Sequence, residues 1–270
     1  MTRQQATNAL AEALGLRAGM CVAVVGAGGK TTLCWRLTQA LAAAGERVIF
    51  TTTTRIWQPA EGTFDRLCIG PPDDILRRLC AATDWRTACL AQDIQGQPDA
   101  APIREAAMPC VRTKLLGFPT EAIANLKAVL KATWLVEADG ARGLLVKAPG
   151  LHEPAIPPCA DLVCVLASLD AVGRPLDDQT VHRAARATQL AGARLAHPIT
   201  PTMLINLLVH PEGGLKGIPA AAHRVAVLTQ RAADACPVWA GALMAALHRS
   251  GFERVVLLSP RAAHPLLGAR

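Results

Sequence analysis

Short apolar runs alternate with amphipathic segments along the first part of the chain. Residues 20–25 form a continuous apolar run that ends at a group of glycines, a pattern typical of a buried parallel strand. Residues 30–44 follow, with leucines repeated every four positions on one face and Gly45 directly after them. This spacing predicts an amphipathic helix that ends at the glycine. A second strand is predicted over residues 47–52.

The alternation continues toward the C-terminus and predicts the class of fold. We expect further strands at residues 66–69, 87–91, 133–137, 161–167, 224–228 and 254–258, and helices at residues 3–15, 73–81, 120–131, 201–209 and 237–248. Asp73 and Thr120 are the expected N-caps of two of these helices. Strands that alternate with helices in this way predict an α/β fold with an open, mostly parallel sheet and helices on both faces.

Residues 1–270 are predicted to form a single domain. The length fits one large α/β domain, and the sequence shows neither an internal repeat nor a low-complexity linker. Residues 93–119 contain several Gly and Pro residues and little periodicity, so we expect them to leave the core as an irregular excursion.

The segment between the first strand and the first long helix carries the strongest chemical signal. It is expected to cradle the phosphates of ATP or GTP as a P-loop, with successive backbone N–H groups and the positive end of the helix dipole directed at the anion. Lys30 is predicted to reach the β- and γ-phosphates, and the hydroxyl of Thr31 is predicted to bind Mg²⁺. The predicted nucleotide-binding residues of this loop are Gly26, Ala27, Gly28, Gly29, Lys30, Thr31 and Thr32.

The loop departs from the full Walker pattern, because Val24 stands where the first glycine belongs. It resembles the shortened Gly-Thr-Asn-Gly-Lys-Thr loop of Mur-type ligases. A dinucleotide-binding loop is the main alternative, but it requires a third glycine where Thr31 stands and an acidic residue near Phe50 and Thr51. The third interpretation is a glycine-rich turn that binds no ligand, but it does not explain the Lys-Thr-Thr sequence at the start of the helix.

Polar side chains follow two other strands, at the edge of the sheet where the phosphate loop lies. Residues 51–54 are four consecutive threonines, of which Thr52 and Thr53 are predicted to sense the γ-phosphate or to complete the Mg²⁺ shell. Glu137 and Asp139 end another apolar strand. In a Walker-B motif, a carboxylate at the end of such a strand holds Mg²⁺. The two residues are two positions apart, so their side chains are expected on the same face of the strand, and which of them binds Mg²⁺ stays open.

Several charged residues later in the chain are expected at the same edge of the sheet as the predicted phosphate loop. Arg174 is the candidate that neutralises a transferring phosphoryl group or binds an acidic substrate. His152 is a candidate base or a structural residue, and residues 210–217 form either a lid or a turn-rich connection. Residues 229–234 follow a strand where GTPases carry Asn-Lys-x-Asp, but here the pattern is altered, so the base stays open. The other candidates are Arg142, Lys147, Glu153, Asp170, His182, Arg183 and Lys216.

Composition and charge narrow the possible partners. No apolar run approaches the roughly 18 residues of a membrane helix, and no signal-peptide pattern is present, so we expect a cytoplasmic protein without a membrane partner. The net charge of +7 favours an anionic partner. The arginines are dispersed and only four phenylalanines and no tyrosines occur, which favours a nucleotide over nucleic acid. Nine scattered cysteines without a Cys-x-x-Cys pair indicate mainly structural thiols.

Taken in order, these motifs resemble the YqeC family. The resemblance covers roughly residues 5–260 and rests on the phosphate loop, the threonine run, Glu-Ala-Asp-Gly-Ala at 137–141, Lys-Ala-Pro and His-Glu-Pro within 147–154, and His-Pro-Glu-Gly-Gly-Leu-Lys-Gly at 210–217. It implies a P-loop NTPase-like protein that acts in maturation or insertion of the selenium- or molybdenum-containing cofactor of a molybdenum hydroxylase. The implied partners are a nucleoside triphosphate and a molybdenum hydroxylase client or its cofactor.

Three hypotheses about activity follow from the residues and the resemblance together. The first is a Mg²⁺-dependent nucleoside triphosphate hydrolase, with Lys30, Glu137, Asp139 and Arg174 as its catalytic residues. The second is a small-molecule kinase or Mur-like ligase that passes the phosphoryl group to an acceptor. The third is a non-enzymatic, nucleotide-gated chaperone with negligible turnover.

Overall fold

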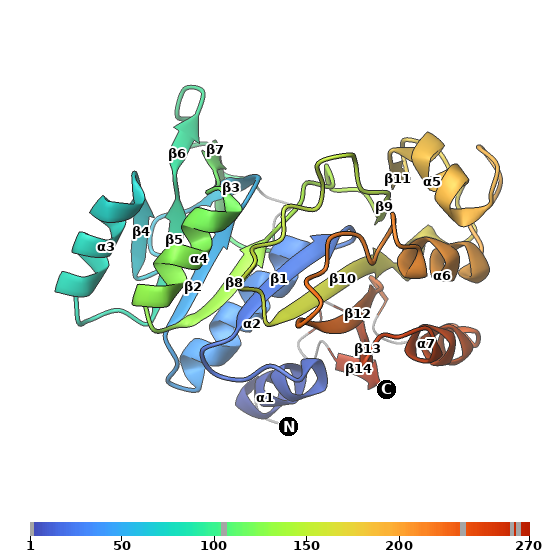
Figure 1. Cartoon of the computed structure of the whole chain (residues 1–270), viewed down its shortest axis with the longest axis horizontal. Helices are drawn as coiled ribbons and strands as arrows, with labels where there is room; N and C mark the ends of the chain where they lie inside the picture. Colours follow the sequence, from blue (N-terminus) through green and yellow to red (C-terminus); the bar gives the residue numbers. More distant parts are fainter. Residues whose placement is uncertain (1–2, 104–106, 233–235, 260–261, 263–265) are drawn as a thin grey trace.

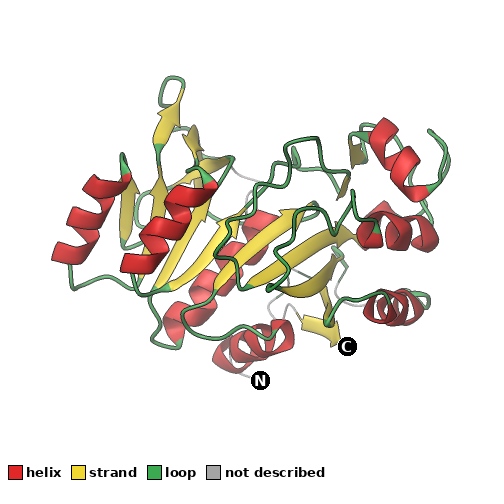
Figure 2. Ribbon diagram, viewed as in Figure 1, coloured by secondary structure: helices red, strands yellow, loops and turns green. Residues whose placement is uncertain are grey.

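A nine-stranded sheet forms the centre of the computed structural model, which describes residues 3–103, 107–232, 236–259, 262 and 266–270 (Figures 1 and 2). Its strand order is β14-β13-β12-β10-β1-β8-β2-β5-β4, and every neighbouring pair is parallel except β13 and β14. The strands are β1 (Cys21–Gly26), β2 (Val48–Thr52), β4 (Arg66–Ile69), β5 (Thr87–Ala91), β8 (Thr133–Glu137), β10 (Leu162–Ser168), β12 (His223–Thr229), β13 (Arg254–Leu258) and β14 (Leu266–Ala269).

Helices cover both faces of this sheet, because the apolar side chains of the central strands alternate between them. Val22 and Val24 of β1 pack in the core under α1 and α2, whereas Ala23 and Val25 pack in the core of the opposite face. The helices are α1 (Arg3–Leu14) and α2 (Lys30–Ala43) on one face, and α3 (Pro72–Ala81), α4 (Thr120–Val129), α5 (Ala184–Ala191), α6 (Pro201–Val209) and α7 (Ala240–Arg249) on the other. The predicted open, mostly parallel α/β sheet is confirmed.

A three-stranded antiparallel sheet extends the main sheet beyond its carboxyl edge. It has the order β3-β7-β6, with β3 (Arg55–Pro59), β7 (Cys110–Leu116) and β6 (Asp93–Gln95). β3 begins directly after the threonines that follow β2, and β6 begins one residue after β5. The neighbouring strands β2 and β5 therefore continue into this small sheet, with β7 inserted between their extensions.

Two short parallel strands lie on the other side of the central strands. They are β9 (Val146–Lys147) and β11 (Val181–His182), and in Figure 1 they are separated from β3, β6 and β7 by the ends of the central strands. A 3-10 turn, η1 (Leu169–Ala171), follows β10 directly. The two small sheets thus flank the edge of the main sheet at which the predicted phosphate loop lies.

The structure departs from the sequence-based expectations at several elements. Asp73 and Thr120 are not N-caps: Pro71 and Pro119 hold those positions, and the predicted residues lie in the first helical turns. Residues 93–119 are not irregular throughout, because they contain β6 and β7. The sequence did not indicate β3, β14 or α5, because these elements are short or pair with strands that are distant in the chain. No described helix has the length and apolar character required to cross a bilayer.

Candidate functional site

The loop after β1 is wound so tightly that only glycine fits at its key positions. Gly26, Gly28 and Gly29 have φ angles of 90°, 90° and 122°, in the region that L-residues rarely adopt. A Cβ atom at Gly26 would lie 2.2 Å from the Leu166 carbonyl oxygen. The amides of Ala27 and Gly28 donate to the carbonyls of Leu166 and Leu144, at 3.0 and 3.1 Å, and fix the loop against its neighbours.

The start of α2 presents backbone donors that the protein itself does not use. The amides of Gly29, Lys30, Thr31 and Thr32 have no hydrogen-bond acceptor among the described residues, as expected for the first turn of a helix without a side-chain cap. These groups lie at the positive end of the helix dipole. All four residues line a cleft, so the donors are placed where an anion can reach them.

Lys30 lies at the floor of this loop and stays charged. Its ammonium donates to the carbonyl oxygen of Gly26 at 2.8 Å and lies 3.1 Å from Asp139 Oδ1 and 3.9 Å from Glu137 Oε1. Burial disfavours the charge, but the two carboxylates outweigh burial and raise the pKa of Lys30 above its ordinary value. Glu137 at 3.9 Å is beyond hydrogen-bond distance, so within the described structure one of the three donors of the ammonium is available to a further acceptor.

Asp139 lies behind the loop, at the buried end of a row of alternating charges. Its Oδ2 accepts a hydrogen bond from the Gly26 amide at 2.9 Å and lies 3.0 Å from the ammonium of Lys147. Lys147 in turn contacts Glu153 at 2.9 Å, and Glu153 contacts Arg183 at 2.7 Å. Asp139 does not line the cleft, so its geometry is that of a residue that positions Lys30 and the loop.

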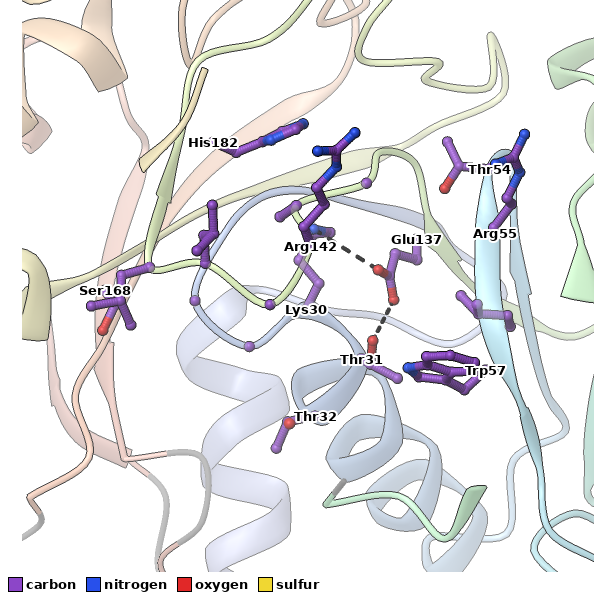
Figure 3. A pocket seen from close by; sticks show the side chains of 18 of the residues that line it. Lys30, Thr31, Thr32, Thr54, Arg55, Trp57, Glu137, Arg142, Ser168 and His182 are labelled. Carbon is purple, nitrogen blue, oxygen red and sulfur yellow. Dashed lines mark hydrogen bonds and ion pairs between the residues drawn. The ribbon is translucent and has the colours of Figure 1, made fainter. Parts of the chain in front are cut away.

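Glu137 and Thr31 form the pair that faces the cleft. The Thr31 hydroxyl donates to Glu137 Oε2 at 2.7 Å, which leaves the lone pairs of Thr31 Oγ1 available to a cation (Figure 3). Burial raises the pKa of Glu137 above its ordinary value, against the opposing effects of Lys30 and Thr31. The described residues contain no cluster of three or more His, Cys, Asp or Glu side chains that holds a metal alone. This donor set suits Mg²⁺, which commonly binds through one or two carboxylates together with substrate phosphates.

The four threonines after β2 have different partners. Thr51 donates to the carbonyl oxygen of Leu90, and Thr52 donates to that of Glu137 at 2.6 Å while accepting from the Thr54 amide at 3.0 Å. Thr53 differs, because its buried hydroxyl has no hydrogen-bond partner in the described structure and the residue lines the cleft. A buried polar group of this kind indicates a position where a ligand completes the hydrogen bonding.

The cleft is large and has two dissimilar walls. Its volume is about 1510 Å³, above the range of roughly 300–1,000 Å³ of ordinary ligand pockets. In Figure 3, His182 lies on one side of Lys30 and Trp57 and Arg55 lie on the other, with Arg142 above Lys30. Arg142 has a φ of 52°, a strained conformation of a kind that clusters at functional sites.

The structure brings most of the predicted site residues together, with some exceptions. Arg174 and His152 are exposed and do not line the cleft. Thr229 contacts the loop directly, its hydroxyl donating to the Gly28 carbonyl oxygen at 2.7 Å, whereas the predicted base-recognition segment ends at Asp234, outside the described residues. Lys114 and Trp57 were not singled out from the sequence, because antiparallel pairing of distant strands places them at the cleft.

Comparison with known proteins identifies the family. A protein from Escherichia coli (strain K12), described as "Uncharacterized protein YqeC", is 30% identical over 205 residues, which cover 76% of this chain and 73% of that protein. No solved structure matches the chain. The sequence profile described as "YqeC protein" matches residues 22–185, which include the phosphate loop, the threonine run, both carboxylates and the β9–β11 segment. The chain therefore belongs to the YqeC family.

Proposed function

We propose that the protein binds a Mg²⁺–nucleoside triphosphate at residues 26–32 and hydrolyses it. The observation that carries this proposal is the turn at the start of α2, where four amides without an acceptor among the described residues line a cleft beside the buried ammonium of Lys30. Amides, helix dipole and ammonium together favour a strongly anionic group at this point. The uncommon glycine conformations allow the tight turn that brings these amides and the ammonium to one point.

Thr31 and Glu137 are the residues that would hold Mg²⁺, and Mg²⁺ would neutralise charge on the β- and γ-phosphate oxygens. Asp139 would act through Lys30, by positioning its ammonium under the loop. The unpartnered hydroxyl of Thr53 would donate to the γ-phosphate end or to the attacking water. Arg142 lines the cleft and replaces Arg174 as the cation placed to neutralise the transferring phosphoryl group.

Calorimetric titration and phosphate release test this proposal together. We expect MgATP or MgGTP to bind and release phosphate, with Lys30→Ala lowering affinity more than about 100-fold, as expected for loss of about 3 kcal/mol of charge-assisted contacts. The matched control is Lys131→Ala, at an exposed lysine after α4. Absence of binding at millimolar nucleotide, or equal binding by Lys30→Ala, would show that the loop does not hold phosphates.

We further propose the role that the resemblance to the YqeC family implies, which is maturing or inserting the selenium- or molybdenum-containing cofactor of a molybdenum hydroxylase. Membership of the family supports this proposal. The size of the cleft supports transfer of the phosphoryl group to an acceptor as a second candidate activity. Phosphate transfer that requires an added acceptor identifies a kinase or ligase. Tight nucleotide binding with turnover below about 10⁻³ s⁻¹, the scale of an unassisted GTPase, identifies a nucleotide-gated chaperone.

A further inference from the structure

The cleft contains a second compartment, formed by the small sheet of β3 and β7. β3 continues from β2 after the threonines, and the end of β7 is joined to the same turn, since the amides of Gly117 and Phe118 donate to the carbonyls of Thr54 and Thr52. This sheet is therefore fixed beside Thr53, the residue with the unpartnered hydroxyl. Any molecule that binds on it lies next to the phosphate loop.

The pairing of β3 with β7 decides which side chains this compartment presents. Trp57 is directly opposite Lys114, and Arg55 is directly opposite Leu116, so these four side chains share one face of the small sheet. The intervening Ile56 is buried in the core. All four side chains line the cleft, and Trp57 and Leu116 are 38% and 37% exposed. An aromatic ring and an exposed leucine thus lie beside two cations.

We call the face formed by Arg55, Trp57, Lys114 and Leu116 the wall. Its two cations are not paired with a carboxylate in the part of the chain that the structure describes. Neither Arg55 nor Lys114 forms an ion pair with a carboxylate of the described residues. Lys114 Nζ lies 3.3 Å from the centroid of the Trp57 ring, so its closest compensation is an aromatic face. Burial holds the pKa of Lys114 below its ordinary value, although the charge of Glu137 acts against this effect, and Arg55 adds a smaller contribution in the same direction as burial. Arg55 and Lys114 thus share one face without a directly paired carboxylate of the described residues, which favours an anion at this position.

We propose that this wall binds a planar heteroaromatic anion, which is the second ligand of the protein and lies beside the γ-phosphate end of the nucleotide. Arg55 and Lys114 take its phosphate or carboxylate group, and Trp57 and Leu116 contact its ring system. The nucleoside of the nucleotide then lies on the opposite side of the loop, toward Ser168 and Thr229, where Asp170 and Arg231 also line the cleft and pair with each other. This inference rests on the proposed function for the position of the nucleotide.

Flavin mononucleotide is a suitable probe, because it combines a planar ring system with a phosphate and changes its fluorescence when it stacks on tryptophan. The full-length protein is saturated with MgADP and titrated with flavin mononucleotide. We expect saturable binding, weakened about tenfold by Trp57→Ala and about tenfold by Lys114→Gln, consistent with the usual strength of stacking and of charge-assisted contacts. Uncharged riboflavin should bind about tenfold more weakly than the phosphate.

The control variant is Lys131→Gln, which removes an exposed lysine outside the cleft and should bind the probe as the wild type does. Thermal unfolding shows whether each variant is folded, and Arg55→Gln replaces either variant that is not. Displacement of the probe by MgADP, equal affinity for riboflavin, undiminished binding by the wall variants, or absence of binding at millimolar probe would each overturn the proposal.

The outcomes for the two ligands can be separated. If MgADP itself does not bind, the proposed function fails, and the same titration of Lys30→Ala without nucleotide still tests the wall. Probe binding that depends on Trp57 and Lys114 in that variant supports the compartment alone. If MgADP binds and the probe does not, the proposed function stands and only the second ligand site is wrong.

Discussion

Two pairs of residues with similar side chains, Thr52 with Thr53 and Glu137 with Asp139, differ in the contacts that their side chains make. Thr52 has its hydroxyl fully engaged between Glu137 O and Thr54 N, whereas the buried hydroxyl of Thr53 has no partner in the described structure. Glu137 faces the cleft with Thr31, whereas Asp139 contacts two lysines behind the loop. One residue of each pair is held by contacts within the protein, and the other lines the cleft.

The two threonines should respond differently to replacement by the isosteric valine. Thr52→Val removes a satisfied, buried hydrogen-bonding group, so we expect the free energy of unfolding to fall by about 1–3 kcal/mol. Thr53→Val removes a buried hydroxyl without a partner, so stability should be unchanged or higher, while nucleotide affinity falls. Urea unfolding and calorimetric titration measure both quantities. The opposite ranking of stabilities would show that Thr53 has a partner in solution.

The raised pKa of Glu137 predicts a pH dependence of the Mg²⁺ effect. Below this pKa the protonated carboxyl group is a poor metal ligand, and above it the carboxylate is available. The factor by which Mg²⁺ strengthens nucleotide binding should therefore increase as pH rises from the ordinary glutamate value of 4.5 through the raised pKa. Glu137→Gln should abolish this rise, as measured by titration with and without Mg²⁺. A variant that keeps the rise would assign the titration to another group.

At the scale of elements, the phosphate loop depends on the strands on either side of it. The loop follows β1, and its amides donate to the ends of β10 and of the segment before β9. Gly28 is held close to Ser168, since an added Cβ atom would lie 2.9 Å from the side chain and amide of that residue. Gly45, at the other end of α2, has nearly the same φ of 89° but open space around it.

These two glycines form a matched pair for mutagenesis. Gly45→Ala should cost about 1 kcal/mol of stability through backbone strain alone and leave nucleotide affinity unchanged. Gly28→Ala adds a steric conflict to the same strain, so we expect a larger loss of stability and a fall in nucleotide affinity of at least about tenfold. Chemical unfolding and calorimetry provide the comparison. Equal effects of the two substitutions on affinity would mean that the loop does not need its observed shape.

At the scale of the whole molecule, a row of charges connects the phosphate loop with the β9–β11 side. It runs from Lys30 through Asp139, Lys147 and Glu153 to Arg183. The contacts with Lys147 and Arg183 lower the pKa of Glu153 to about 2, despite the opposing effect of burial. Lys216, from the loop of residues 210–217, donates to the carbonyls of Gly150 and Leu151 and ties that loop to the same segment.

The acid sensitivity of the molecule should depend on Glu153. Its folded-state pKa of about 2 lies below the ordinary value of 4.5, so its contribution to stability is fully present above 4.5 and is lost as pH falls through about 2. Glu153→Gln should lower the unfolding free energy by about 2 kcal/mol at pH 7, and this difference should shrink as the solution is acidified below 4.5. Guanidinium unfolding across pH measures it. A difference that stays constant down to pH 2 would exclude the ionic contribution of Glu153.

The sequence by itself determined the parallel strands of the main sheet, the order of most of its strands and helices, and the glycine-rich turn before α2, because these depend on local periodicity and on consecutive residues such as Gly28, Gly29 and Lys30. The tertiary structure alone decided which carboxylate faces the cleft and where Arg174 lies. The alternation of side chains along a strand predicts the face on which each residue lies, but not the side chains that surround it. It also created the wall of Trp57 and Lys114, which are far apart in the chain and meet only because β3 and β7 pair antiparallel. Contacts of that range follow from topology, and neither residue shows a local pattern from which its position at the cleft follows.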